Sequence, residues 1–355
     1  MKNPLRKRFF RELREEIGKY LVVFILMAAT IGFVSGFLVA DGSMLTAYNN
    51  SFQKYNIEDG KFETEEKIYK NQQEDIEKKG VTLYENFYVE KALLNGTTLR
   101  IFKNRAKVDK VCLMKGKLPE KTGEIAIDRM YADNNKLSVG DSLQSGKRKW
   151  KITGLVALSD YSALFQNNND TMFDAVKFGA AVVTEEEFSS FNQSQLVYNY
   201  AWTYIHKPKT EAQEKKKSED FMEELSKDVT LEEFVPQYLN QAIHFTGDDM
   251  GGDRAMIIVL LYIVIAIMAF VFGITTSNTI RKEAGVIGTL RASGYTKNEL
   301  IRHYMFMPLL VTFIGAIVGN LLGYTVFKNV CADMYYGSYS LPTYVTLWNA
   351  EAFLL

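Results

Sequence analysis

Cysteine and histidine are scarce in this chain of 355 residues, which has two cysteines and three histidines. Cys112 and Cys331 lie far apart and match no metal-ligand spacing, so the sequence predicts neither a disulfide framework nor a zinc site. His206, His244 and His303 are scattered and form no HExxH motif. A GxSxG motif is also missing. The sequence therefore offers no catalytic or metal-binding residue, and we expect no enzyme active site.

A phosphate-binding loop is also missing. The nearest approach is Gly140 to Arg148, GDSLQSGKR. Five residues separate its two glycines, and Arg148 stands where a serine or threonine must reach magnesium. We therefore expect no nucleotide, and no other cofactor, to bind this chain itself.

Charge is absent from three long stretches, residues 21–40, 255–280 and 304–327. A bilayer core about 30 Å thick needs about 20 apolar residues as helix. We therefore predict three transmembrane helices. A cleaved signal peptide is the alternative for 21–40, but that run exceeds the usual apolar core of about 7–15 residues. Because the spans contain no ionisable residue, an ion-coupled transport pathway is not expected.

The charges between these stretches predict the orientation of the chain. Residues 1–20 carry a net charge of +4 and residues 281–303 carry +3, whereas residues 41–254 carry −6. Basic flanks stay in the cytoplasm. We therefore place the amino terminus and 281–303 on the cytoplasmic side of a bacterial cell membrane and 41–254 on the outer side. Residues 328–355 then form an external loop and the beginning of a fourth span, of which the chain contains only the start.

The first twenty residues favour an amphipathic helix in the cytoplasm. Apolar residues recur every four positions, at Leu5, Phe9, Leu13 and Ile17, with basic residues on the other faces. A helix of this kind lies in the lipid headgroup layer. A helix on a soluble partner is the alternative.

Residues 41–254 indicate a large mixed α+β domain. Branched and aromatic residues predict strands at 123–131, 150–158, 178–184 and 200–206. Charged stretches at 64–80 and 209–228 predict helices. The loop 159–174 carries apolar residues on both sides of NNND. It is either an exposed tip that meets a partner or a local core under a polar turn. Calcium is not expected there, since the distal glutamate of an EF-hand is missing.

Small residues recur every four positions in the first and third spans. Such spacing places them on one helix face, where another helix can approach closely, within one subunit or between subunits. The alternative is that glycine is simply common in membrane helices. The glycines concerned are Gly32, Gly36, Gly315, Gly319 and Gly323. Asn320 is expected to form a hydrogen bond to a neighbouring helix.

The segment 281–303 predicts a helix–turn–helix. The second span can continue as a helix to Ala292, and Gly294 suits the left-handed residue that ends it. Thr296 and Glu299 form a capping box that begins the next helix. Three residues give this hairpin an outward apolar patch, Val286, Ile287 and Leu290. A plain re-entry hairpin explains the basic residues but leaves this patch unexplained.

Two motifs in the chain resemble a known family. EAGVIGTLRASGYTKNEL, residues 283–300, resembles the coupling segment of FtsX-like, MacB-like ABC transporter permeases. GKLPEKTGEIAIDRMYADNNKLSVGDSL, residues 116–143, resembles the periplasmic-core pattern of the same family. The order of first span, long outside domain and later spans also agrees, so the resemblance extends over nearly the whole chain.

The resemblance implies an α-helical transmembrane protein with an extracytoplasmic domain of the MacB periplasmic-core type. It implies the amino-terminal portion of a longer permease of the mechanotransmission type, in the type VII ABC superfamily. The implied partners are a separate ABC-type ATPase subunit that binds ATP, a second permease copy or half, and membrane lipid, with no nucleic acid. Six residues would contact the ATPase: Glu283, Gly285, Ile287, Leu290, Arg291 and Gly294.

Such permeases export or extract peptides, antibiotics, lipids or lipoproteins, or activate cell-wall enzymes. Two other functions are compatible with a membrane protein of this layout. A membrane-anchored receptor that senses a ligand is one, but the visible cytoplasmic pieces are small. A membrane-tethered enzyme is the other, and the missing catalytic set argues against it.

Overall fold

The computed structural model describes Arg14 and residues 16–354. Most of the amphipathic helix predicted over residues 1–20 lies outside these residues. The chain divides into two compact units. The helical unit contains Met1–Ser43, Gly251–Asp333 and Thr346–Leu355, and the α+β unit contains Met44–Met250 and Met334–Val345. The second unit thus takes a segment from the far end of the chain that the sequence assigns to an external loop.

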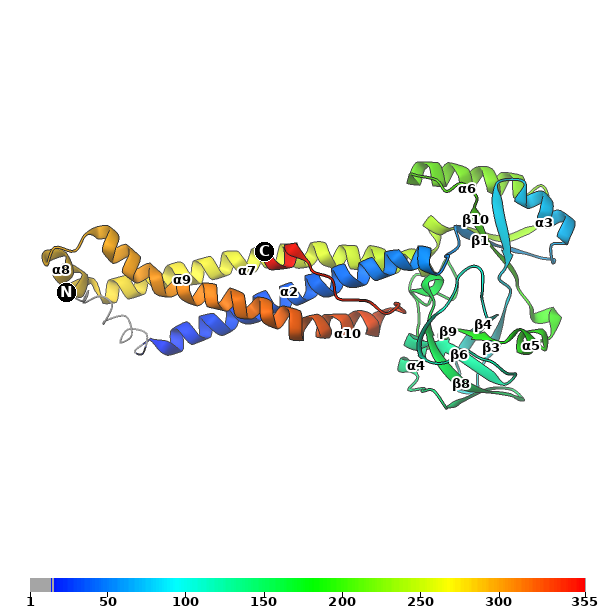
Figure 1. Ribbon diagram of the computed structural model, residues 1–355, viewed down its shortest axis with the longest axis horizontal. Coiled ribbons are helices and arrows are strands. Elements are labelled where there is room, and N and C mark those ends of the chain that lie inside the picture. Colours follow the sequence, from blue (N-terminus) through cyan, green and yellow to red (C-terminus); the bar gives the residue numbers. More distant parts are fainter. Residues whose placement is uncertain (1–13, 15, 355) are drawn as a thin grey trace. The chain divides into compact units, whose positions relative to one another are not determined.

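Three helices among the described residues are long and apolar enough to cross a membrane. They are α2 (Ile17–Lys54), α7 (Gln241–Lys282) and the continuous stretch Lys297–Ser338, shown in Figure 1. The last consists of α9 (Lys297–Leu322), a π-helical turn (Gly323–Phe327) and α10 (Lys328–Ser338). Two short helices complete the unit, α8 (Ala284–Ala292) and α11 (Ala350–Leu354). The helices α2 and α7 run beyond their predicted apolar spans, because their outer turns belong to the α+β unit.

The described part of the α+β unit has two sheets, in the strand orders β11-β1-β10-β2 and β3-β4-β9-β6-β8-β5, with β7 paired to β8. The first sheet is antiparallel. It is formed by β1 (Gly60–Thr64), β2 (Val81–Glu85), β10 (Tyr198–Tyr204) and β11 (Leu231–Pro236). The second is mixed and is formed by β3 (Tyr88–Ala92), β4 (Thr98–Lys103), β5 (Cys112–Gly116), β6 (Glu124–Asp128), β7 (Ser142–Ser145), β8 (Arg148–Ala157) and β9 (Phe178–Val183).

Four α-helices and three 3-10 turns complete the described part of this unit (Figure 1). They are α3 (Lys70–Glu77), α4 (Arg129–Asn134), α5 (Glu185–Ser189), α6 (Glu211–Leu225), η1 (Ser159–Tyr161), η2 (Gln193–Gln195) and η3 (Gln237–Leu239). The strands predicted over 150–158, 178–184 and 200–206 and the helix predicted over 209–228 are confirmed. The strand predicted over 123–131 is only partly right, since β6 ends at Asp128 and α4 begins at Arg129. The helix predicted over 64–80 is only partly right, since Thr64 ends β1 and the helix begins at Lys70.

Alternating burial explains why β1 is a strand rather than the start of a helix. Phe62 is fully buried and lies against the rings of Tyr200, Trp202 and Phe221, while its neighbours on either side are half-buried. A side-chain period of two buries one face of a strand, whereas a helix would turn these residues to different sides. Phe221 belongs to α6, so this aromatic cluster also holds that helix on the first sheet.

The NNND loop covers a local core. The rings of Phe165, Phe173 and Phe245 lie 5.5 to 5.7 Å apart, and Tyr339 joins them at 6.0 Å from Phe173. Tyr339, near the carboxyl end of the chain, is therefore part of this core and is only 5% exposed. Aromatic spacing alone cannot distinguish a lipid-facing ring from one buried by a distant segment.

Small residues of α2 and α9 lie against each other. A Cβ atom built on Gly319 would lie 2.8 Å from Cβ of Ile31 and 3.0 Å from the carbonyl oxygen of Ala28. One built on Gly36 would lie 2.6 Å from Cβ of Phe327. The other glycines of the two ladders make the same kind of contact, with nearest atoms at 3.0 Å for Gly32, 3.4 Å for Gly315 and 2.8 Å for Gly323. The backbones approach this closely only because the side chains are missing.

A hydrogen bond accompanies this contact. The Ser35 hydroxyl of α2 lies 3.0 Å from Oδ1 of Asn320 in α9, to which it donates. The expectation that Asn320 bonds to a neighbouring helix is thus confirmed. Within a membrane such a bond satisfies two polar groups that lipid cannot satisfy.

A cluster of charged side chains is buried where the two sheets of the α+β unit adjoin. Arg105 donates two hydrogen bonds to Asp160, at 2.5 and 3.0 Å, and both side chains are 3% exposed. Asp109 accepts from the backbone NH of Glu58 at 2.9 Å and from Nδ2 of Asn86 at 3.0 Å. The pKa of the Glu58 carboxyl is raised to about 7, chiefly because the group is buried; Lys61 and Arg105 oppose this rise and Asp160 contributes to it.

Replacing Gly319 by leucine should destabilise the helical unit. The new side chain would overlap Ile31 and the α2 backbone, and overpacking of this kind costs about 1–3 kcal/mol. Gly273→Leu in α7 is the matched control, because a Cβ there meets nothing within 4 Å. Thermal unfolding of the detergent-purified protein measures both. An equal midpoint for the two variants would show that the contact between α2 and α9 is not close-packed.

Glu58 should make the stability of the α+β unit depend on pH. Its pKa in the folded protein is raised above 4.5, so its protonated form stabilises the fold, fully below about pH 4.5, and this contribution is lost as the pH rises through about 7. Glu58→Gln should therefore lose less thermal stability than the unmodified protein between about pH 5 and about pH 8. The exposed Glu66→Gln is the control. Parallel pH profiles for all three proteins would contradict this assignment.

Candidate functional site

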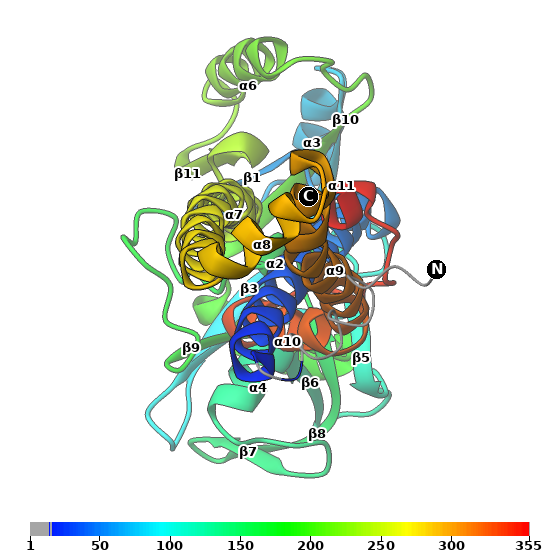
Figure 2. The ribbon, with the colours of Figure 1, turned by 90° about the vertical axis from the view of Figure 1, so that its left-hand side faces the viewer.

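The hairpin between α7 and α9 begins with a one-residue interruption of the helix. Glu283 leaves helical geometry, with φ −98° and ψ 12°, and separates α7 from α8. The continuous helix predicted as far as Ala292 is therefore wrong at this residue. Tyr304 of α9 donates a hydrogen bond of 2.5 Å to Oε2 of Glu283. The Glu283 carboxylate thus contacts α9. The interruption lets α8 turn toward α9, as Figure 2 shows.

The turn after α8 is closed by backbone hydrogen bonds. Gly294 has φ +96°, the left-handed conformation expected for it. The NH of Tyr295 lies 3.2 Å from the carbonyl oxygen of Leu290, and the NH of Gly294 lies 3.1 Å from that of Arg291. These two bonds form a Schellman motif, which satisfies carbonyls that the end of a helix would otherwise leave free. Arg291 adds a side-chain bond of 3.0 Å to the carbonyl of Tyr295.

The capping box predicted for the next helix is present. Oε2 of Glu299 accepts a hydrogen bond from the NH of Thr296 at 2.8 Å, and Oγ1 of Thr296 accepts one from the NH of Glu299 at 3.3 Å. Reciprocal bonds of this kind fix the first turn of a helix. With the Schellman motif directly before it, the turn from α8 to α9 has few free torsions. The hairpin is therefore a stiff structure.

The α8 helix presents its surface to its surroundings, and none of its side chains is buried. Val286 is 38% exposed, while Ile287 and Leu290 are half-buried. Gly285 and Gly288 face open space, because a Cβ atom at either would meet nothing within 4 Å. An exposed helix with apolar side chains and bare backbone is suited to contact another protein.

The six residues named from the sequence have different positions in the hairpin. Gly285 and Arg291 are exposed, and Ile287 and Leu290 are half-buried. Glu283 is directed to Tyr304 of α9, and Gly294 forms the turn. Four of the six are thus on the surface of α8, and the other two determine the geometry of the hairpin.

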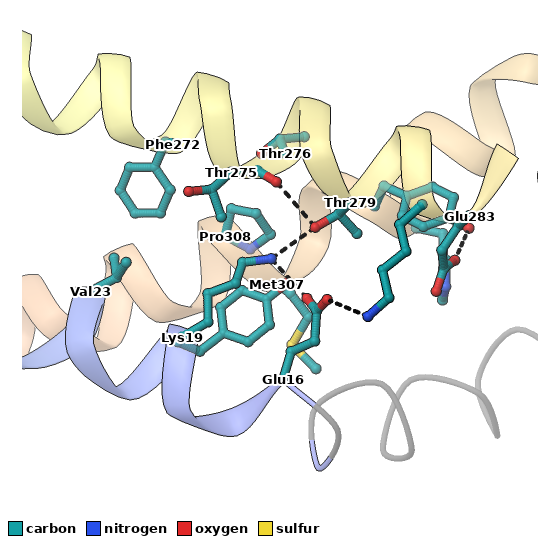
Figure 3. Close-up of a pocket in the computed structure, with 14 residues that line it drawn as sticks. Glu16, Lys19, Val23, Phe272, Thr275, Thr276, Thr279, Glu283, Met307 and Pro308 are labelled. Carbon is teal, nitrogen blue, oxygen red and sulfur yellow. Dashed lines mark hydrogen bonds and ion pairs between the residues drawn. The ribbon is translucent and has the colours of Figure 1, made fainter.

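A small cavity of about 90 Å³ lies at the base of the hairpin, between α2, α7 and α9 (Figure 3). Lys19 of α2 lies across it and donates hydrogen bonds to Oγ1 of Thr279 in α7 at 2.8 Å and to Glu16 at 2.7 Å. Glu16 also lies 4.0 Å from Nζ of Lys282. The ends of α2 and α7 are therefore joined by a polar cluster next to the hairpin.

This cluster is not among the site residues predicted from the sequence. Lys19 and Thr279 lie 260 positions apart, and each looks like an ordinary residue at the end of an apolar run. The only signal is that Lys19 and Glu16 adjoin the first span at the same membrane face as the hairpin. Across the described residues, no group of three or more His, Cys, Asp or Glu side chains is arranged to hold a metal ion.

Comparison with known proteins gives one family match. No curated protein matches the chain in sequence. The chain is similar to the periplasmic region of MacB from Actinobacillus actinomycetemcomitans, with 11% identity over 47% of this chain and 83% of that chain and a TM-score of 0.30. It is also similar to the extracellular domain of the noncanonic ABC-type transporter YknZ from Gram-positive bacteria, with 10% identity over 49% and 98% and a TM-score of 0.30.

The family match covers the helical part that contains the hairpin. Residues 258–355 match the FtsX-like permease C-terminal family, and this range includes most of α7 and all of α8, α9 and α10. This segment of the chain is therefore similar to the carboxyl-terminal part of FtsX-like permeases.

Proposed function

We propose that the chain is the permease subunit of an ABC transporter that couples ATP hydrolysis by a separate cytoplasmic ATPase subunit to movement of its α+β unit. The observation that supports this most directly is the hairpin. It combines an exposed helix, α8, with a turn closed by a Schellman motif and a capping box. A partner that pushes on α8 would move α7 and α9 with it, since a stiff turn does not absorb the displacement.

The polar cluster at the base of the hairpin extends this coupling to α2. Lys19 bridges to Thr279 of α7, and Glu283 bridges to Tyr304 of α9. Movement of the hairpin would therefore displace all three long helices. Of these, α2 and α7 are unbroken over 38 and 42 residues. Hydrogen-bonded helices of this length transmit displacement along their axes as nearly rigid bodies.

The charge distribution supports the orientation. The basic segments 1–20 and 281–303 would lie in the cytoplasm and the acidic segment 41–254 outside. The ATPase would then reach α8, while the α+β unit would act on a cargo beyond the membrane. In this proposal the chain binds no ATP and catalyses no reaction. Its cargo is a peptide, antibiotic, lipid or lipoprotein, or its movement activates a cell-wall enzyme. It acts together with a second permease copy or half.

Aspartate at Leu290 should weaken binding of the ATPase. The substitution places a charge on the half-buried apolar side of α8, where desolvation is costly. We expect at least tenfold weaker binding and loss of coupled ATP hydrolysis in a co-purification from membranes. Val286→Asp is the second variant, because Val286 is already exposed and its replacement leaves the hairpin folded.

The control for both is Asn298→Asp, which adds the same charge to the same hairpin at an exposed position of α9. It should bind normally. If both α8 variants bind the ATPase as tightly as the control, α8 is not the contact.

Cysteine labelling tests the orientation. Lys297→Cys in the hairpin should react with a membrane-impermeant maleimide only after the membrane is opened, whereas Lys209→Cys in the α+β unit should react in intact cells. Both positions are exposed, and the native Cys112 and Cys331 are buried. Reaction of Lys297→Cys from the outside medium would reverse the assignment.

A further inference from the structure

The segment Met334–Val345, at the end of α10 and just beyond it, belongs to the α+β unit. We propose that Asp128 and Arg129 form a latch that fastens this segment to the α+β unit, so that the third long helix is a mechanical connection to that unit alongside α2 and α7. This inference rests on the proposed function, since it names positioning residues for force transmission. Asp128 and Arg129 lie in the segment 116–143 that resembles the periplasmic-core pattern, and the resemblance gives neither residue a role.

Arg129 holds the end of α10. Its Nη2 donates to the carbonyl oxygens of Tyr336 and Tyr339, both at 2.7 Å, and its guanidinium lies 5.1 Å from the centre of the Tyr336 ring. Since α10 ends at Ser338, these carbonyls are among those that a helix terminus leaves without intrahelical partners. A guanidinium is well suited here, because it offers several donors in fixed geometry and its positive charge interacts favourably with the carboxyl end of a helix dipole.

Asp128 holds the residues that follow α10 in the chain. One carboxylate oxygen caps α4 by accepting from the NH of Tyr131 at 3.1 Å. The other accepts a hydrogen bond from the hydroxyl of Ser340. Both Asp128 and Ser340 are fully buried, and the NH of Ser340 donates to the carbonyl of Ser162 at 2.8 Å. A buried carboxylate with its partners removed is costly, so this contact resists opening.

The latch also joins the segment beyond α10 to α7. The hydroxyl of Tyr339 donates to Oδ2 of Asp249, in the α7 turns that belong to the α+β unit, at 2.5 Å. The Tyr339 ring packs 6.0 Å from Phe173 and 6.4 Å from Phe245. Both helices that leave the hairpin are thus fastened to each other at their other ends, within the α+β unit. A change in the position of α9 relative to α7 must then strain this connection or move the unit.

The Arg129 side chain has one partner that the latch does not need. Its Nη1 donates to Asp133, a neighbour within α4, at 2.8 Å, and the side chain of Asp133 is 59% exposed. The carbonyls of Tyr336 and Tyr339 are 207 and 210 positions away in sequence. Asp133→Ala therefore removes a local ion pair from the same guanidinium and leaves the latch in place, which makes it a matched control for Arg129→Ala.

Hydrogen exchange by mass spectrometry tests the latch in the full-length protein bound to its ATPase in lipid nanodiscs. Arg129→Ala should speed exchange in 334–345 by about tenfold, because hydrogen bonds to a charged group are lost. It should also abolish the ATP-dependent change in exchange within 44–250, while ATP hydrolysis stays within about twofold of normal. Arg129→Lys should recover only part of both effects, since it cannot reproduce the fork of the guanidinium. Asp133→Ala should behave like the unmodified protein.

Normal exchange in 334–345, or a normal ATP response in 44–250, with Arg129→Ala would overturn the latch. If Arg129→Ala fails to fold, Ser340→Ala gives the same test with a smaller change, and unaltered exchange there would equally overturn it. Failure of the proposed function is distinguishable, because the unmodified protein would then bind no ATPase and show no ATP-dependent change at all.

Discussion

The hydrogen bond from the backbone NH of Tyr295 to the carbonyl of Leu290 is a single contact, but the stiffness of the hairpin depends on it. A connection between two membrane helices can be loose or stiff, and only a stiff one converts contact at its tip into movement of the helices. Here Gly294 takes a conformation that other residues resist, and the capping box begins the next helix two residues later. The Glu283–Tyr304 bond adds a second brace across the hairpin. These three contacts together make the hairpin stiff.

The long helices meet by different means at different depths. In the apolar stretch, α2 and α9 contact through glycines and one serine–asparagine bond, because lipid tails give apolar side chains little reason to prefer a helix over their surroundings. At the hairpin end, α2 and α7 are joined by Lys19 and Thr279. The membrane part thus replaces the hydrophobic core of a soluble protein with close backbone contact and a few polar links.

Features determined by near neighbours could be predicted from the sequence. The capping box, the glycine at the turn, the three long helices and the strand of β9 all follow from residues within a few positions of one another. The interruption at Glu283 could not be predicted, because the partner of its carboxylate, Tyr304, lies 21 positions away on the next helix. The same holds for Arg129 and Tyr336 and for Tyr339 in its aromatic cluster, where the sequence contains no trace of which distant segments meet.

The π-helical turn Gly323–Phe327 lies in the continuous helical stretch Lys297–Ser338, which runs from the hairpin to the segment Met334–Val345. A π-turn holds one residue more than an α-turn, so closing it to α geometry would swing everything beyond it by about 100° around the axis and by about 1.5 Å along it. Phe327, whose ring packs over Gly32 of α2, sits on this turn. A change of this turn to α geometry would therefore rotate α10 about its own axis.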